Sequence, residues 1–134
     1  MQRAAGFTLL EVLVSVVILS VALLGTAALT ASSLKTTNSS YYLSQSTVLA
    51  DDILDRMRAN IEKARSGDYD IDPDTDCADE STMAGFDCKE WKDGLAAALP
   101  GGTGSVEYNA ADGTATIVIS WDGGADSFTT ISQL

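Results

Sequence analysis

The longest apolar stretch of the chain lies near its N-terminus. From Val12 to Leu34 there are 23 consecutive residues without a charge. As an α-helix, this stretch would span roughly 35 Å, which is enough to cross the hydrocarbon core of a bilayer. The apolar run begins at Phe7, after a short polar segment of residues 1–6, and it contains one carboxylate, Glu11. The pattern predicts a membrane-spanning helix over residues 7–34.

Beyond this stretch the apolar positions become periodic. Spacings of three and four residues place the following side chains on one helix face: Leu43, Thr47, Ala50, Leu54, Met57 and Ile61. We therefore expect an amphipathic continuation of the helix over residues 35–66, packed on a sheet farther along the chain. An unbroken helix over residues 7–63 would be about 85 Å long. Residues 36–40, T-T-N-S-S, contain few helix formers, and they predict fraying or a bend there.

The C-terminal residues alternate between apolar and polar. We expect strands over residues 104–108, 114–121 and 127–132, joined by turns rich in Gly, Asp and Ala, so that residues 104–134 form an antiparallel meander. One face of the middle strand would cover the amphipathic helix. That face carries Ala115, Ile117, Ile119 and Trp121. We interpret Trp121 as a packing residue and not as a ligand platform.

A short helix is expected before the sheet, over residues 87–99. Asp87 and Glu90 have the spacing of a capping box, and Pro100 with the two following glycines would end the helix. Its apolar face would consist of Trp91, Leu95 and Leu99. The expected fold is therefore α+β: a long N-terminal helix packed on a small antiparallel sheet, with a short extra helix.

Charge is distributed unevenly along the chain, whose formal net charge is −11. Residues 1–60 contain four basic and four acidic residues, whereas residues 61–134 contain four basic and fifteen acidic residues. Such an acidic surface repels phosphate backbones, so we expect no direct binding to nucleic acid. Arg56 and Arg58 are interpreted as solvated helix charges near their own acids.

Residues 67–103 begin with five aspartates at alternate positions, from Asp68 to Asp76. An EF-hand loop needs glycine at its sixth position and glutamate at its twelfth, but counting from Asp68 these positions hold Pro73 and Asp79. An EF-hand is therefore excluded. A calcium site of another kind stays open, although a solvated acidic loop is the preferred interpretation.

The residues Gly6-Phe7-Thr8-Leu9-Leu10-Glu11 resemble the type III leader junction of type IV pilins and of type II secretion pseudopilins. The resemblance implies that a prepilin peptidase removes residues 1–6 by cleaving after Gly6 and methylates the new amino terminus at Phe7. It also implies that Glu11 meets the amino terminus of a neighbouring subunit during filament assembly. The alternative is that Glu11 lies at the membrane interface and reaches headgroup water.

Two further segments resemble the PilV-type minor pilins, the type IV pilus modification proteins. They are the second half of the long helix, with Gln45-Ser46, Leu49-Ala50 and residues 55–60, and the spacing of Cys, Trp, Leu and Pro-Gly-Gly in the short helix. Many major pilins carry a proline about three turns into the first helix, whereas this chain has none before Pro73. This difference favours a minor subunit.

The resemblance places the C-terminal part of the chain in the periplasm, and Arg3 before the span agrees with a cytoplasmic N-terminus. Because the periplasm is oxidising, we expect a disulfide between Cys77 and Cys88. Small residues in the span allow close packing of helices, and hydroxyl groups among them can donate hydrogen bonds to carbonyls of the preceding turn; the two roles are compatible. These small residues are Ser15, Ser20, Gly25, Thr26 and Thr30.

Catalysis finds no support, because the chain has no histidine and no glycine-rich phosphate loop after a strand. We expect no enzyme activity, no cofactor, no small-molecule substrate and, apart from the calcium alternative in the acidic loop, no metal site. The expected function is a minor pilin that initiates or modifies a type IV pilus, from the inner membrane to the filament or its tip. Its partners would be prepilin peptidase, other pilins and the inner-membrane assembly platform. The alternatives are a minor pseudopilin of type II secretion, or a membrane-anchored periplasmic protein that does not polymerise.

Overall fold

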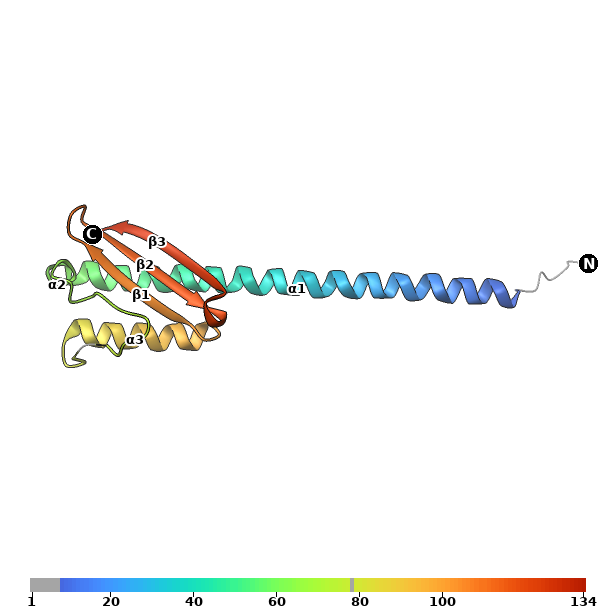
Figure 1. Ribbon diagram of the computed structural model, residues 1–134, viewed down its shortest axis with the longest axis horizontal. Coiled ribbons are helices and arrows are strands. Elements are labelled where there is room, and N and C mark those ends of the chain that lie inside the picture. Colours follow the sequence, from blue (N-terminus) through green and yellow to red (C-terminus); the bar gives the residue numbers. More distant parts are fainter. Residues whose placement is uncertain (1–7, 78) are drawn as a thin grey trace, which may run out of the picture. The chain divides into compact units, whose positions relative to one another are not determined.

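A computed structural model describes residues 8–77 and 79–134. The chain divides into two compact units, Met1–Ser39 and Ser40–Leu134, which are described separately here. One helix, α1 (Leu9–Ala59), supplies residues to both units (Figure 1). The other elements lie in the second unit. They are α2 (Ile61–Arg65), α3 (Met83–Ala98), β1 (Thr103–Asn109), β2 (Thr114–Trp121), the 3₁₀ turn η1 (Asp122–Gly124) and β3 (Asp126–Gln133).

The described part of the first unit is helical, and its apolar side chains are exposed. Its hydroxyl groups donate to carbonyls of the preceding turn: Ser15 to Glu11 at 2.7 Å, Ser20 to Val16 at 2.7 Å and Thr30 to Thr26 at 2.9 Å. A hydroxyl satisfied in this way can be accommodated within a membrane helix. This confirms backbone bonding for these residues.

The expected fraying at residues 36–40 is wrong, because α1 continues through them. The hydroxyls of Thr36 and Thr37 donate to the carbonyls of Ser32 at 3.2 Å and Ser33 at 2.9 Å. These side chains therefore bond to the helix that carries them instead of competing with it, which offsets part of their low helix propensity.

The second unit is built on a three-stranded antiparallel sheet of order β1-β2-β3. The register pairs Val106 with Ile117 and Ile117 with Thr130. The predicted strands are confirmed, and β2 has the predicted bounds. Figure 1 shows the sheet across the C-terminal part of α1, with α3 beside that part of the helix.

The core lies between the inner face of the sheet and the two longer helices. Its main members are Ala50, Ile53, Leu54 and Met57 of α1, Trp91 and Leu95 of α3, and the predicted face of β2, Ala115, Ile117, Ile119 and Trp121. The predicted stripe on α1 is partly wrong, because Leu43 and Thr47 are exposed while Ser46 and Ile53 are buried. The buried face therefore starts at Ser46.

The end of α1 also differs from the prediction of an unbroken helix to residue 63. Asn60 leaves the helical region, with φ −124° and ψ 50°, and separates α1 from α2. Its amide Nδ2 donates to the hydroxyl oxygen of Tyr69 at 3.3 Å, a contact that stabilises the break. The predicted end at Ser66-Gly67 is confirmed, and Gly67 has φ +85°, which glycine adopts without strain.

The predicted start of the short helix at Asp87 is wrong. Helix α3 begins at Met83, after Thr82, whose hydroxyl oxygen accepts from the backbone N–H of Gly85 at 3.1 Å. Thr82 therefore caps the helix, and Asp87 lies inside it with only 5% of its surface exposed. The predicted end before Pro100 is confirmed.

Candidate assembly and processing site

The predicted processing site lies outside the described residues. Gly6 and Phe7 fall within residues 1–7, so leader cleavage and N-methylation stay predictions. Thr8 is the first described residue, and α1 begins immediately after it. The geometry of the site is therefore built from Thr8 onward.

Thr8 caps the N-terminus of α1. The backbone N–H of Glu11 donates to the Thr8 carbonyl at 3.0 Å and to the Thr8 hydroxyl at 3.3 Å. Thr8 and Glu11 have the spacing of a capping box, and the Glu11 carboxylate lies in the first turn, where the helix dipole favours negative charge. The Thr-x-x-Glu spacing indicates this role of Thr8, although it was not among the predictions made from the sequence.

The Glu11 side chain is exposed on a helix surface that is otherwise apolar. Among residues 8–77 and 79–134, no salt bridge to Glu11 is formed. Neighbouring apolar side chains are exposed as well, including Leu10 and Val12. In lipid, an unpaired carboxylate in such a setting costs roughly 3 kcal/mol, so a cation brought to it would be strongly bound.

Within the described residues, α1 is the one helix long and apolar enough to cross a membrane. Its apolar residues from Leu9 to Leu34 are not buried against any described part of the chain. Such a surface is stable in lipid or against other apolar helices, and unfavourable in water. The helix can therefore serve both as an anchor and as a packing element.

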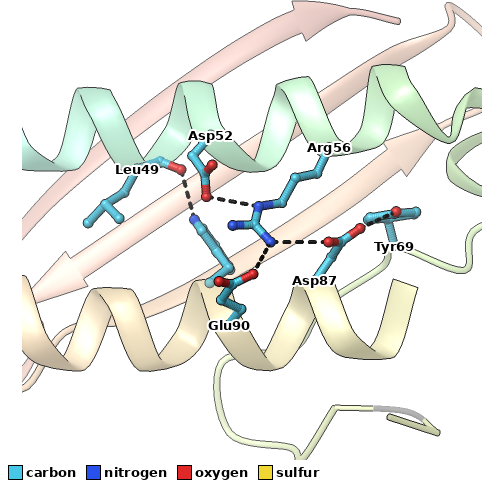
Figure 2. A network of polar contacts seen from close by, with 7 residues as sticks. Leu49, Asp52, Arg56, Tyr69, Asp87 and Glu90 are labelled. Atoms are coloured by element: carbon cyan, nitrogen blue, oxygen red, sulfur yellow. Dashed lines mark hydrogen bonds and ion pairs between the residues drawn. The ribbon is translucent and has the colours of Figure 1, made fainter. Parts of the chain in front are cut away.

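A second polar cluster lies in the C-terminal unit and joins α1 to α3 (Figure 2). Arg56 contacts Asp52 at 3.0 Å, Asp87 at 3.1 Å and Glu90 at 2.6 Å. On its other side, Asp87 accepts from the Tyr69 hydroxyl at 2.6 Å. Near this cluster the indole N–H of Trp91 donates to the Leu49 carbonyl at 2.8 Å. We call Asp52, Arg56, Tyr69, Asp87 and Glu90 the Arg56 network.

Acidic partners, and for Tyr69 also burial, keep the donors of the Arg56 network protonated. The hydrogen bond that Arg56 donates to Glu90, aided by Asp87 and Asp52, raises the pKa of Arg56 above its usual value, although burial acts in the opposite direction. Burial and the hydrogen bond to Asp87 raise the pKa of Tyr69 to about 12. Neither donor releases a proton near neutral pH, so the arrangement suits fixed cross-linking between helices.

The interpretation of both arginines as solvated charges is wrong for Arg56. Its side chain bridges α1 and α3, although one of its partners, Asp52, is the expected acid on its own helix. Arg58 does pair with its own Asp55 at 2.9 Å, as expected, and also donates to the Ser132 hydroxyl at 2.9 Å. The sequence does not show which acids of α3 face Arg56, because Asp87 lies 31 residues away.

The acidic loop is held by protein contacts. Cys77 and Cys88 form a disulfide with Cα atoms 5.8 Å apart, which ties the loop to the first turns of α3. The ammonium group of Lys92 donates to the carbonyls of Asp72 at 2.7 Å and Thr75 at 2.5 Å. Lys63 pairs with Asp68 at 2.9 Å. In the described part of the chain, no three acidic or cysteine residues gather in a way that could hold a metal ion.

The N-terminal residues of the chain match a known protein family. Residues 1–27 match the family described as the Prokaryotic N-terminal methylation motif. No curated protein and no solved structure matches the chain. The match supports a type IV pilin-like or pseudopilin signal at the N-terminus, of the kind that prepilin peptidase processes. The α+β architecture, a long helix on a small antiparallel sheet, is pilin-like as well.

Proposed function

We propose that the chain is a minor pilin of the PilV type, which initiates or modifies a type IV pilus. Prepilin peptidase cleaves after Gly6 and methylates Phe7. The mature chain stays in the inner membrane through residues 7–34, with its C-terminal unit in the periplasm. It then joins other pilins at the assembly platform and enters the filament or its tip.

One combination of observations carries the proposal. The N-terminal methylation motif over residues 1–27 coincides with an exposed apolar helix whose first turn holds a carboxylate, Glu11. In lipid that carboxylate has no counter-charge among the described residues. The methylated amine of a neighbouring chain supplies one, and in a low dielectric the pair is worth far more than the roughly 1 kcal/mol of an exposed pair in water. Assembly is therefore favoured over the solitary membrane state.

The proposal is tested by removing the charge of Glu11 while keeping its shape. Glu11→Gln should be cleaved normally by the peptidase, yet its amount in sheared filaments should fall at least about tenfold, corresponding to about 1.4 kcal/mol. The measurement is the ratio of filament-bound to membrane-bound chain in cells that also produce the partner pilins. Glu62→Gln is the matched control, because Glu62 is an exposed glutamate in the first turn of α2.

The outcomes separate the proposal from a simple anchor. Loss of Glu11→Gln from filaments, with Glu62→Gln unaffected, supports assembly through this carboxylate. A Glu11→Gln chain that enters filaments as well as the original protein would contradict the role of Glu11. A chain that is never found in filaments in either form would contradict the proposal as a whole.

A further inference from the structure

The two edges of the sheet differ. On the β1 side, Ile71 exchanges two hydrogen bonds of 2.9 Å with Val106, and the carboxylate of Asp70 accepts from the N–H of Tyr108 at 2.8 Å. On the other side, the order β1-β2-β3 leaves β3 without a partner strand in the described part of the chain (Figure 1). The edge formed by β3 is therefore open.

The direction of the N–H groups of β3 follows from its register. The backbone N–H of Leu134 donates to the Gly113 carbonyl at 3.0 Å, so this position faces β2. Because an antiparallel strand alternates, every second N–H group faces the other way. The outward N–H groups are those of Ser127, Thr129, Ile131 and Gln133.

The composition of β3 suits pairing. Residues 127–134, S-F-T-T-I-S-Q-L, contain neither a charge nor a proline, although the chain as a whole is strongly acidic. Ile131 is 66% exposed. Proteins usually protect an edge with charges, prolines or a covering segment, and an edge without them is a template for another extended segment.

The charges at the start of β3 are negative. Asp126 opens the strand, Asp122 lies in η1 just before it, and both are exposed. Among the described residues neither forms an ion pair. The six basic side chains of the second unit contact other groups. Four pair with carboxylates, Arg56, Arg58, Lys63 and Lys89, and two donate to backbone carbonyls, Arg65 and Lys92. A partner at this end of the edge is therefore expected to be basic.

A second copy of the chain does not fit this edge. Antiparallel pairing of two β3 strands around a two-fold axis would make α1 leave the two units in opposite directions, so the two spans of the proposed function could not lie in one bilayer. Parallel pairing in register would place two Asp126 carboxylates side by side, and like charges on neighbouring strands destabilise a sheet. A flexible segment of another protein meets neither obstacle.

We propose that the β3 edge binds an extended segment of another protein, antiparallel to β3, whose residues are uncharged and β-branched and whose last residues are lysine or arginine. In this direction the end of the incoming segment lies beside the start of β3, so its cations meet Asp122 and Asp126. Hydrogen bonds to the outward N–H groups supply affinity, and the cations determine direction and register. The exposed side chain of Ile131 offers an apolar contact to a β-branched residue opposite.

A synthetic peptide tests the proposal with the full chain in mild detergent. The probe is T-V-T-V-T-V-K-K, amidated at its C-terminus and labelled with a fluorophore at its N-terminus, and its binding is measured by fluorescence anisotropy. At low ionic strength it should bind at least about fivefold more tightly than T-V-T-V-T-V-E-E. The peptide K-K-T-V-T-V-T-V, with its cations at the other end, should bind at least about threefold more weakly than the probe.

Variants of the chain locate the binding at the β3 edge. Ile131→Pro removes an outward N–H without breaking the ladder to β2, and it should weaken binding of the probe at least about tenfold. Ile131→Ala is the matched control, because it shortens the side chain but keeps the N–H, and it should cost less than about threefold. Asp126→Asn should remove most of the preference for the lysine peptide, whereas Asp93→Asn, at an exposed acid on α3, should leave it unchanged.

Three results would overturn the proposal. The first is equal binding of the lysine and glutamate peptides, which needs no variant. The second is equal binding of the probe to the original chain and to Ile131→Pro. The third is a dimer of the full chain that Ile131→Pro abolishes while the probe does not bind, which would assign the edge to a second copy. None of these measurements involves leader cleavage or filament entry, so each result is separate from the test of the proposed function.

Discussion

At the scale of single residues, Asp87 is a buried acid whose stability depends on its hydrogen-bond and ion-pair partners. Its carboxylate is 5% exposed, accepts from Tyr69 and pairs with Arg56. Asp87→Ala removes the acceptor of both donors and leaves them partly buried. We expect the free energy of unfolding to fall by about 2–4 kcal/mol. Urea unfolding of the full chain in mild detergent, followed by the fluorescence of the buried Trp91 and Trp121, measures the change.

Asp93→Ala is the control for this measurement. Asp93 lies on the same helix, but it is exposed. Its replacement should change stability by no more than about 0.5 kcal/mol. Equal effects at Asp87 and Asp93 would show that the Arg56 network adds nothing to stability.

Tyr69 gives the unit a pH dependence in the alkaline range. Its pKa is raised from 10.0 to about 12 in the folded chain, so the folded state holds this proton more tightly than the unfolded state. The resulting stability is fully present below pH 10 and is lost as the pH rises toward 12, by up to about 3 kcal/mol. Chemical denaturation at a series of pH values should show this loss. Tyr69→Phe, which has no phenol to titrate, should lose less stability over the same interval.

At the scale of elements, α3 packs closely on a glycine of β1, whereas a glycine of α3 itself leaves room for a side chain. A Cβ on Gly104 in β1 would lie 2.5 Å from Cη2 of Trp91, whereas one on Gly94 in α3 would meet Cδ2 of Leu49 at an ordinary 3.5 Å. Gly104→Ala should therefore destabilise the unit by about 1–3 kcal/mol. Gly94→Ala should stabilise it by about 0.5–1 kcal/mol, because alanine favours a helix. Thermal unfolding of both variants tests this contrast, and destabilisation of similar size at both positions would disprove it.

The regular elements could be predicted because their signals are local. Alternation along β2 and the turn residues on either side of it determine its bounds, and the apolar run predicts α1. Helix boundaries were harder, because several residues near each end could end or cap a helix, and side-chain hydrogen bonds decide between them. Asn60 breaks α1 where its amide meets Tyr69, and Thr82 caps α3 where an Asp87–Glu90 spacing favoured a later start.

The candidate site, too, could be predicted from the sequence only in part. Glu11 is evident from the sequence, since a lone carboxylate interrupts an apolar run. The Arg56 network is not, because the alternating charges of an amphipathic helix do not reveal a partner far along the chain. The capping role of Thr8 is an intermediate case. Its spacing to Glu11 is typical of a capping box, but the surrounding apolar residues favour the interpretation as a membrane span.

At the scale of the whole molecule, the two compact units have different properties. The first unit carries an apolar helix that needs lipid or other helices around it. The second unit has its own core, disulfide and sheet, so it contains the interactions that hold its fold together. The function proposed here depends on the first unit being freed from its leader, because only a new amino terminus at Phe7 can meet the carboxylate of a neighbour.

The mass of the mature chain tests this requirement most directly. The full chain is produced with and without an active prepilin peptidase, and the intact mass is measured in each case. Our account predicts that the peptidase yields a chain beginning at Phe7 and carrying one added methyl group, while the chain made without it retains residues 1–6. A chain that keeps Gly6 in the presence of the active peptidase would contradict the account.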